Sequence, residues 1–363
     1  MVNLEADSLE SMMSWVLSLR SSCFMKHNIS SDDFDFISVL GRGYYGKVSL
    51  VQSKKTKEYY ALKSIKKCRL AKMKKLETVI NEKNILRKIQ HPFIVSMKFT
   101  YQTASKFYIG MEYIAGGDLF FHLKNGGTFS IEKVRLYISE ISLAIQYLHE
   151  NDIIYRDIKP ENILLDEEGH IKLTDFGLSK ELKNDEEEEC NSFCGTPDYY
   201  APEIVLHQKY GKAIDWWSIG ILTYELLFRK TPFHSKNEDK LFKNILKYSP
   251  EFPEGTSQDV IDFISMLLEK DPNKRAGFDE VNCHPFFNGL NFSDVYMRRI
   301  KADFVPKVMS KSDSTNFEKQ FTEENPSDSF VAPYMGSLSN VSDFSCNLIF
   351  SESSVSEPSR LEP

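Results

Sequence analysis

Three glycines in the stretch GRGYYGKVSLV constrain the fold most strongly, because positions 41, 43 and 46 have the spacing GxGxxG. In a dinucleotide-binding unit this spacing opens a helix. Here Val48, Leu50 and Val51 follow, and these residues are typical of a β-strand. The stretch therefore predicts a glycine-rich hairpin whose backbone N–H groups can approach phosphates. Taken alone, it could equally be a plain glycine hairpin.

The segments around this hairpin predict a small antiparallel sheet. FDFISVLG, KVSLVQS, EYYALKSI and KFYIGMEYI are short and rich in β-branched and aromatic residues. One helix is expected among them at residues 76–89, where Val79, Leu86 and Ile89 share a face.

After the stretch AGGD the pattern becomes helical. Apolar residues that recur at intervals of three and four predict a long helix facing the core; they are Ile131, Val134, Ile138, Ile141, Ile145 and Leu148. DWWSIGILTYELLF is apolar almost all round and should be a fully buried helix. We therefore expect an α+β fold of two lobes, a small antiparallel β-rich lobe with one main helix and a larger α-helical lobe.

These patterns divide the chain into four stretches. Residues 34–113 are expected to form the small lobe and residues 114–288 the larger one, after an N-terminal segment of unknown role at residues 1–33. Residues 289–363 are expected to be a partly disordered tail, because Ser, Asp, Glu, Asn and Pro dominate most of it and cannot build a core. The scattered aromatic residues of the tail suggest that it wraps on another surface.

Composition argues against several classes of protein. The formal net charge of −7 gives no basic face for nucleic acid. The six cysteines form no CxxC pair, so neither a zinc site nor a disulfide framework is expected. No apolar run reaches the roughly 18 residues that span a bilayer, and the N-terminus lacks a signal-peptide pattern. We therefore expect a cytoplasmic protein without nucleic-acid partners or a transmembrane segment, with access to the nucleus left open.

A set of charged and amide side chains indicates phosphate chemistry. Lys63 lies mid-strand in YALKSI, where an unpaired ammonium would be costly, and Glu82 on the next helix is its natural partner. Two carboxylates, an amine and an amide follow in the stretches IIYRDIKPENILL and LTDFGLSK; they belong to Asp157, Asp175, Lys159 and Asn162. Carboxylate and amide oxygens beside a phosphate-binding loop suit Mg²⁺. Each acid alone could be a helix cap or a turn residue, but their joint occurrence in this order indicates a nucleotide site.

Together these motifs resemble those of a eukaryotic protein kinase over residues 34–288. The resemblance implies transfer of the γ-phosphate of ATP to Ser or Thr hydroxyls, with Mg²⁺ as cofactor and two ions expected. It implies that Asp157 accepts the hydroxyl proton and Lys159 steadies the γ-phosphate, while Asn162 and Asp175 hold the metal. The residues that it assigns to ATP are Leu40, Gly41, Gly43, Gly46, Val48, Ala61, Lys63, Glu82, Met111, Glu112, Ile114 and Asp118. Lys159, together with Thr196, also favours Ser/Thr over tyrosine substrates.

A subgroup is indicated by Tyr155, which stands where most kinases have His. The sequence YRD is similar to the AGC group, in which this position packs against the Asp-Phe-Gly turn and takes no proton. NFSDVYMRRIKADFVPKV and NFEKQFTEENPSDS resemble the regulatory C-terminal extension of the protein kinase B, serum-and-glucocorticoid-regulated and ribosomal-protein kinase branches. The resemblance also implies an ion pair of Glu203 with Arg275, and a bond from Asp215 to the backbone near Arg156.

Regulatory phosphorylation sites are implied by the same resemblance. They are Ser192 in the activation segment, Ser345 in the hydrophobic motif VSDFSC, and Ser329, with Ser327 as the alternative, in the turn motif. Arg156 is the expected receptor of the phosphate on Ser192, and an upstream activating kinase is implied.

Two features of these regulatory segments leave alternatives open. Val341 and Cys346 stand where aromatic residues are usual, so the motif around Phe344 is expected to dock weakly or to be assigned wrongly. A basic cluster could receive a tail phosphate or be a solvated helix end; it comprises Lys66, Lys67, Arg69, Lys72, Lys74 and Lys75.

The acidic run at residues 185–189, shortly before Ser192, has three interpretations. It could be a solvated insertion, it could occupy Arg156 and partly mimic the phosphate, or it could guide an upstream kinase and repel acidic substrates. The nearby Cys190 and Cys194 could form a disulfide or remain free thiols.

The expected substrates follow from three carboxylates. Asp118, Glu161 and Glu225 match positions that meet arginines before the phosphoacceptor, so protein substrates with basic residues there are expected. The protein is expected to act as a monomer. The competing interpretation is a pseudokinase scaffold that binds nucleotide or partners without catalysis, but the intact set of catalytic residues favours an enzyme.

Overall fold

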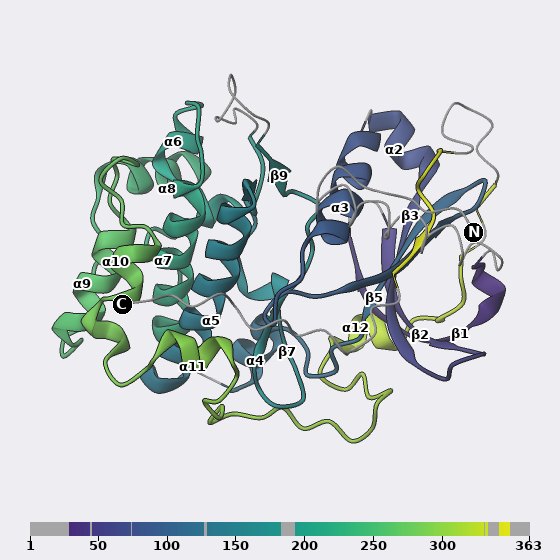
Figure 1. The fold of residues 1–363 in the computed structure, drawn as a ribbon. Helices are drawn as coiled ribbons and strands as arrows, with labels where there is room; N and C mark the ends of the chain where they lie inside the picture. The colour runs from purple at the N-terminus through teal and green to yellow at the C-terminus, as the bar shows by residue number, and fades with distance from the viewer. Residues whose placement is uncertain are drawn as a thin grey trace, which may run out of the picture.

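The computed structural model describes residues 29–43, 46–73, 75–126, 129–182, 193–329, 331–332 and 341–348. These residues form two lobes, a smaller one built on an antiparallel sheet and a larger one built mainly from helices (Figure 1). The α+β fold that the sequence patterns predict is confirmed.

The sheet of the smaller lobe has the strand order β1-β2-β3-β5-β4, and β10 from the tail joins it at the β4 edge. The strands are β1 (Phe34–Arg42), β2 (Gly46–Ser53), β3 (Tyr59–Lys66), β4 (Met97–Gln102), β5 (Lys106–Glu112) and β10 (Cys346–Asn347). A short 3-10 helix, η1 (Ser31–Asp33), precedes β1, and the helices α2 (Lys67–Met73) and α3 (Leu76–Lys88) follow β3. The predicted face of α3 is buried in the core, with Val79 and Leu86 nearly inaccessible.

Close packing requires glycine at one position of the predicted hairpin. A Cβ atom at Gly46 would lie 1.7 Å from the carbonyl oxygen of Ser64 on β3, which no side chain permits. Cβ atoms at Gly41 and Gly43 would meet nothing within 4 Å. The hairpin is therefore packed against the sheet at one end and presents open backbone at the other, where a ligand could approach.

The larger lobe is organised around two buried helices. α5 (Ile131–Glu150) begins after Ser130, whose side chain accepts a hydrogen bond from the backbone N–H of Lys133 at 3.2 Å. α7 (Ala213–Phe228) is buried almost all round and packs against α5 and α9 (Gln258–Leu267). The other helices of the larger lobe are α4 (Leu119–Gly126), η3 (Pro197–Tyr199), α6 (Pro202–Val205), α8 (Glu238–Lys247), α10 (Phe278–Asn282), η4 (Pro285–Phe287) and α11 (Phe292–Tyr296). Among the helices of the described residues, none combines the length and apolar character that crossing a bilayer requires.

Short strand pairs position the loops that carry the predicted catalytic residues. β6 (Ile153–Ile154) pairs with β9 (Lys180–Glu181), and β7 (Ile163–Leu165) pairs with β8 (Ile171–Leu173). The loop 155–162, which ends in the 3-10 helix η2 (Pro160–Asn162), connects β6 to β7, while residues 174–179 connect β8 to β9. The two pairings thus bring both loops to the same place.

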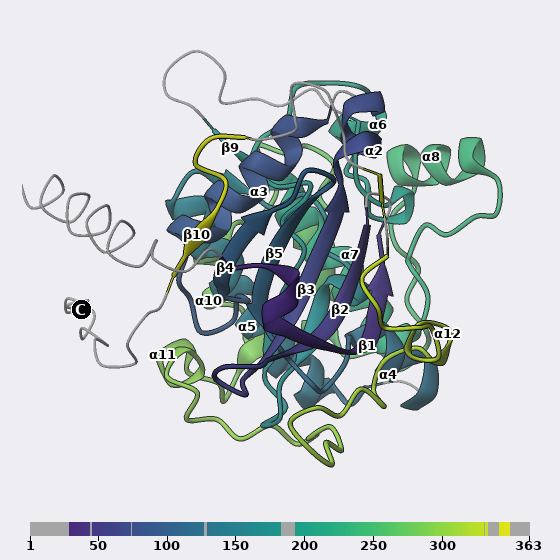
Figure 2. The ribbon, with the colours of Figure 1, turned by 90° about the vertical axis from the view of Figure 1, so that its right-hand side faces the viewer.

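The tail crosses from the larger lobe to the smaller one (Figure 2). The side chain of Asn316 donates hydrogen bonds to the carbonyl oxygens of Ala115, at 3.2 Å, and Lys307, at 2.9 Å. α12 (Lys319–Thr322) then lies beside β1, and β10 pairs antiparallel with β4. Phe317 and Phe344 are buried, so these tail aromatics pack on the smaller lobe instead of forming a core of their own.

Candidate active site

An ion-pair cluster joins the sheet, α3 and the loop after β8. The ammonium of Lys63 on β3 lies 2.5 Å from Glu82 Oε1 and 2.9 Å from Asp175 Oδ1. Burial alone would lower the pKa of Lys63, but the charges of Asp175 and Glu82 outweigh it and the pKa is raised. The same ammonium lowers the pKa of Asp175. The lysine is therefore held as a cation at the edge of the cleft, as the predicted pairing with Glu82 requires.

The loop 155–162 gathers the predicted catalytic groups around Asp157, whose side chain is buried. Lys159 Nζ and Asn162 Nδ2 each donate to Asp157 Oδ2 at 2.8 Å. Thr196 Oγ1 lies 3.4 Å from the other carboxylate oxygen and accepts a hydrogen bond from Lys159 at 3.2 Å. Asp157 is thus fixed in orientation with Oδ1 the less engaged oxygen, and Thr196 contacts this loop as expected.

Two residues of this site have left-handed backbone conformations. Arg156 has φ of 68° and Asp175 has φ of 55°, left-handed conformations that cost about 1 to 3 kcal/mol for side chains other than glycine. Asp215 on α7 offsets part of this cost, because its carboxylate accepts the backbone N–H groups of Tyr155 and Arg156, both at 2.9 Å. This is the bond to the backbone that the resemblance implies.

Tyr155 packs against the Asp-Phe-Gly turn, as expected for this position. Its ring is fully buried and meets the ring of Phe176 edge-on, with centroids 5.2 Å apart. Its hydroxyl donates to the carbonyl oxygen of Thr174. Burial raises the pKa of Tyr155 well above its usual value, so this hydroxyl stays protonated and takes no part in proton transfer.

The residues expected to hold Mg²⁺ have suitable donor atoms. Asn162 donates through its amide nitrogen to Asp157, which leaves its amide oxygen as the atom that can bind a cation. The carboxylate of Asp175 is half exposed and ionised beside Lys63. An amide oxygen and a carboxylate next to the space for phosphates are hard oxygen ligands of the kind Mg²⁺ takes.

The apolar side chains expected around adenine come from the smaller lobe, the linker between the lobes and the tail. Leu40, Val48 and Ala61 form one cluster with Phe317. Met111 on β5 is buried opposite Ala61 on β3, and Ile114 is buried in the linker between the lobes. The side chain of Glu112 instead accepts bonds from the backbone N–H of Ser96, at 2.8 Å, and Lys172, at 3.1 Å, so only its backbone could face a ligand. The sequence reasoning missed Phe317, although an isolated aromatic residue in a polar tail was a usable signal.

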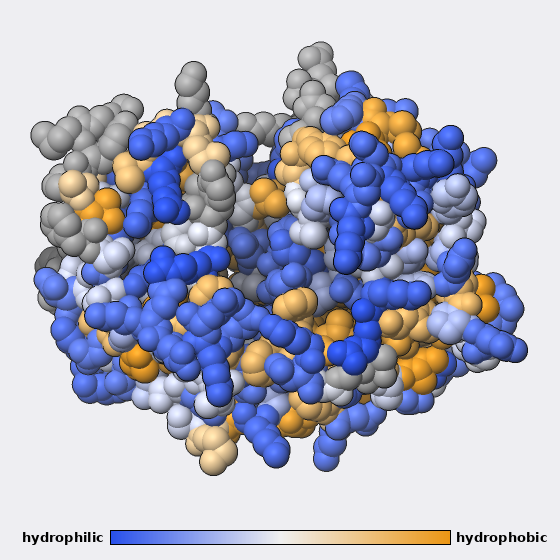
Figure 3. Space-filling model, turned by 180° about the vertical axis from the view of Figure 1, so that it is seen from behind, coloured by the Kyte–Doolittle hydropathy of each residue, from blue (hydrophilic) through white to orange (hydrophobic). Residues whose placement is uncertain are grey.

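The three carboxylates expected to contact basic substrates influence one another. Burial raises the pKa of Asp118 to about 6, and Glu161 adds to this rise. Burial also raises the pKa of Glu225, again with a contribution from Glu161, while Tyr199 donates a hydrogen bond to it. The charge of Glu161 thus acts on both Asp118 and Glu225. Seen from behind, the surface is indented between the two lobes, with mainly hydrophilic residues around the indentation (Figure 3).

The predicted scaffold pair is present beside the site. Arg275 donates to Glu203 through two nitrogens, at 2.6 and 2.9 Å, and both side chains are almost completely buried. This two-point pair ties α6, at the end of the activation segment, to the loop before α10.

The structure describes the predicted phosphate receptor Arg156 and the predicted phosphorylation site Ser329. Ser192, like the acidic run 185–189 and Cys190, lies outside the described residues. Arg156 donates to the carbonyl oxygen of Leu178 at 2.6 Å and to the hydroxyl of Tyr210 at 3.3 Å. Ser329 Oγ lies 3.4 Å from Lys106 Nζ, which is buried and also pairs with Asp328. The sequence indicates the basic cluster around α2 as a possible receptor of a tail phosphate, whereas Ser329 lies beside Lys106 of β5. Within the basic cluster, Lys67 is buried and donates a hydrogen bond to Gln102.

The hydrophobic motif docks on the smaller lobe despite its unusual residues. Phe344 is buried with its ring centroid 4.4 Å from that of Phe107. Thr100 on β4 donates to the carbonyl oxygen of Phe344 at 2.5 Å and accepts the backbone N–H of Cys346 at 3.1 Å. Backbone pairing therefore holds the segment where aromatic side chains are missing, and the neighbouring Ser345 remains exposed.

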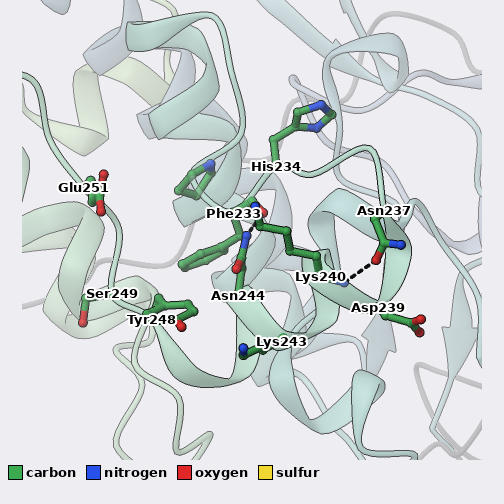
Figure 4. Close-up of a pocket in the computed structure, with 11 residues that line it drawn as sticks. Phe233, His234, Asn237, Asp239, Lys240, Lys243, Asn244, Tyr248, Ser249 and Glu251 are labelled. Carbon is green, nitrogen blue, oxygen red and sulfur yellow. Dashed lines mark hydrogen bonds between the residues drawn. The ribbon is translucent and has the colours of Figure 1, made fainter.

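A hollow of about 650 Å³ lies apart from this site, between α8 and the loops on either side of it (Figure 4). Phe233 and Asn244 are among the residues that line it, and the side chain of Asn244 donates a hydrogen bond to the Phe233 carbonyl oxygen at 3.1 Å. None of the predicted catalytic, nucleotide or substrate residues lines it, so it is not part of the candidate active site.

Comparison with known proteins assigns the class that this cleft defines. The family described as "Protein kinase domain" matches residues 34–287. The RAC family serine/threonine-protein kinase homolog of Dictyostelium discoideum is 40% identical over 296 residues, covering 81% of this chain and 67% of that protein. Serine/threonine-protein kinase YPK1 of Saccharomyces cerevisiae is 41% identical over 310 residues, 85% of this chain and 45% of the relative. Serine/threonine-protein kinase gad8 of Schizosaccharomyces pombe is 39% identical over 321 residues, which cover 86% of this chain and 56% of that protein.

The chain therefore belongs to the protein kinase family and, within it, to the AGC group of serine/threonine kinases that its motifs predict. It spans about half the length of the curated yeast relatives that it matches, with 45% and 56% of their residues covered.

Proposed function

We propose that the protein is a Mg·ATP-dependent serine/threonine kinase that transfers the γ-phosphate of ATP to hydroxyl groups of basic protein substrates. One observation carries the proposal: Asp157, Lys159 and Asn162 are bonded together on one loop of the cleft where Lys63 and Asp175 form an ion pair. A scaffold that only binds nucleotide would have no chemical need for all five groups.

Each residue has a separate part in the proposed reaction. Bound Mg·ATP supplies the phosphoryl group, with the metal neutralising part of its charge. Lys63 binds the α- and β-phosphates as a cation, and Asn162 and Asp175 hold the metal, for which two ions are expected. The less engaged oxygen of Asp157 accepts the proton as the substrate oxygen bonds to the γ-phosphorus. The bond from this phosphorus to the β,γ-bridging oxygen breaks, ADP leaves with that oxygen, and Lys159 steadies the transferred group. Because Asp157 is fixed by Lys159 and Asn162, it needs little reorganisation during transfer.

Substrate choice is proposed to follow from a negatively charged groove formed by three carboxylates. The carboxylates of Asp118, Glu161 and Glu225 favour a peptide with arginines before the phosphoacceptor, because opposite charges guide its approach and alignment. Lys159 and Thr196 close the space beside Asp157, which favours the shorter Ser and Thr side chains over tyrosine.

Phosphorylation by an upstream kinase is proposed to complete the active state. A phosphate on Ser192 adds about −1.5 to −2 charge, which Arg156 could pair with and so order the activation segment. On Ser329 a phosphate would face the buried ammonium of Lys106, which lies 3.4 Å from the serine hydroxyl. Ser345 is exposed next to the docked Phe344 and is accessible to a kinase.

Phosphate transfer to two matched peptides tests this proposal. One peptide carries Arg-x-x-Ser and the other has the arginine replaced by alanine, and the full chain is assayed with Mg·ATP after treatment with an AGC-activating kinase. The proposal predicts transfer that requires Asp175 and is faster with the arginine. Absence of transfer to either peptide would contradict the enzyme, whereas equal transfer to both would contradict the substrate preference alone.

A further inference from the structure

Two cations face each other at the open end of the glycine-rich hairpin. Arg42 is the last residue of β1, and its direct cross-strand partner on β2 is Lys47. Like charges directly opposite each other in an antiparallel pair are destabilising. Arg42 and Lys47 therefore repel each other at the end of the hairpin that would cover the phosphates.

The tail provides acceptors for both cations. Glu324 accepts hydrogen bonds from Arg42 Nε at 2.7 and 3.0 Å and a further one from Arg42 Nη2. The carbonyl oxygen of Ser327 accepts a hydrogen bond from Lys47 Nζ at 2.6 Å. One short segment of the tail thus binds the two strands of the hairpin at once.

The charges of this cluster are coupled. The hydrogen bonds from Arg42 lower the pKa of Glu324, and Lys47 contributes to the same shift. Burial lowers the pKa of Lys47, and the charges of Arg42 and Lys106 lower it further, while Asp328 and Glu324 act in the opposite direction. Glu324 therefore pairs directly with Arg42 and acts on Lys47 only through its charge, which affects Lys47 less than the charge of Asp328 does. Glu324 lies shortly after α12, which is beside β1 (Figure 2).

We propose that Glu324 is a positioning residue for nucleotide binding: by neutralising Arg42, which lies directly opposite Lys47, it keeps the two strands of the hairpin paired. This rests on the proposed function, since the hairpin is taken to cover ATP. Without Glu324, repulsion between the two cations spreads the strands near Gly41 and Gly43. The nucleotide is then held less tightly, although the catalytic groups are untouched.

Glu324→Gln tests the proposal, because it removes the charge and keeps the shape. The KM for ATP and the dissociation constant of the fluorescent analogue TNP-ATP should rise about two- to five-fold, as expected for a solvent-exposed charge interaction. The value of kcat should stay within about two-fold, and the effect should shrink at high salt because the repulsion is screened. Asp35→Asn is the matched control, since Asp35 pairs with Lys54 at 3.9 Å at the other end of the same hairpin, and it should change neither constant.

A second pair of variants separates this mechanism from a simple tether. Arg42→Gln removes one of the opposed cations, so neutralisation predicts near wild-type TNP-ATP binding for Arg42→Gln and for Arg42→Gln/Glu324→Gln. A tether that needs the ion pair predicts weak binding for all three variants, and that result would overturn the proposal. Unchanged binding in Glu324→Gln would overturn it too. Because TNP-ATP binding needs no phosphate transfer, these outcomes stay readable if the proposed kinase activity fails.

Discussion

Glu82 and Lys63 form an ion pair with 2.5 Å between Oε1 and Nζ, and this pair joins α3 to β3. The glutamate side chain is only 3% exposed, so water can do little to replace the lysine. Removing one partner of a buried ion pair leaves an uncompensated charge that costs about 3 to 5 kcal/mol.

Lys63→Met should therefore lower both stability and activity. We expect the free energy of unfolding to fall by about 3 kcal/mol at pH 7. We expect kcat/KM to fall at least about 100-fold, because the charge that we propose stabilises the phosphates is lost. Denaturant unfolding and peptide phosphorylation measure the two effects. Lys88→Met is the matched control, because Lys88 pairs with Glu181 on the surface, with 58% of its side chain exposed. Comparable losses in the two variants would contradict the assigned role of Lys63.

The arginine preference should depend on pH through Asp118. Its pKa is raised to about 6, so the carboxylate is ionised above that value and increasingly neutral below it. The ratio of kcat/KM for the arginine peptide to that for the alanine peptide should rise about fivefold between pH 5 and pH 7, the size expected for a partly screened charge pair. The same raised pKa means that Asp118 contributes less to stability as the pH rises from about 4 to 6.

Asp118→Asn provides the control for this pH profile. Because the amide does not titrate, the ratio should become nearly flat over the same range. A profile that keeps its wild-type slope in Asp118→Asn would assign the titration to another group.

Docking of the hydrophobic motif should depend on one ring. Phe344→Ala removes the contact with Phe107, and deleting a buried phenylalanine ring costs about 3 to 5 kcal/mol. The segment 341–348 should then detach, and hydrogen exchange at β4, which pairs with β10, should speed up. Ser345→Ala, which alters an exposed neighbour, should leave the exchange unchanged. Unaltered protection of β4 in Phe344→Ala would contradict this docking.

The pair of Glu203 and Arg275 should be needed for folding stability. Arg275→Met leaves Glu203 charged in a site where it is only 2% exposed, so the free energy of unfolding should fall by about 3 to 5 kcal/mol. Glu203→Gln in the same variant should recover part of this loss, because it removes the stranded charge. Arg299→Met, at an exposed pair with Asp294, should cost less than about 1 kcal/mol. Equal losses of unfolding free energy in Arg275→Met and Arg299→Met would contradict a larger contribution of the buried pair to stability.

The elements that could be predicted from the sequence are those with a local signal. The period of α5 and the all-round apolar character of α7 indicated buried helices, and the strand that follows the glycines excluded a dinucleotide-binding fold. Asp157, Lys159 and Asn162 lie within six residues, so their meeting required little knowledge of tertiary structure.

The contacts of the tail could not be predicted in this way. Glu324 meets Arg42 across 282 positions of the chain, and no periodicity in a polar segment specifies such a partner. Lys106 looked like the first residue of an ordinary strand, yet it is buried against Asp328. Val341 and Cys346 suggested weak docking because they replace aromatic side chains. The segment is held by the buried ring of Phe344 together with hydrogen bonds between its backbone and the side chains of Thr100 and Gln102.

The measurement that tests the central claim most directly is a rapid-quench transfer experiment with the wild type and Asp157→Asn. Activated enzyme is mixed with Mg·ATP and the Arg-x-x-Ser peptide, and TNP-ATP binding is measured in parallel. We predict that Asp157→Asn lowers the transfer rate about 100-fold or more, the range expected for loss of a positioned base. Its TNP-ATP binding should be unchanged, because Asp157 contacts the loop and not the nucleotide-binding hairpin. An Asp157→Asn variant that transfers phosphate at the wild-type rate would contradict the assigned chemistry.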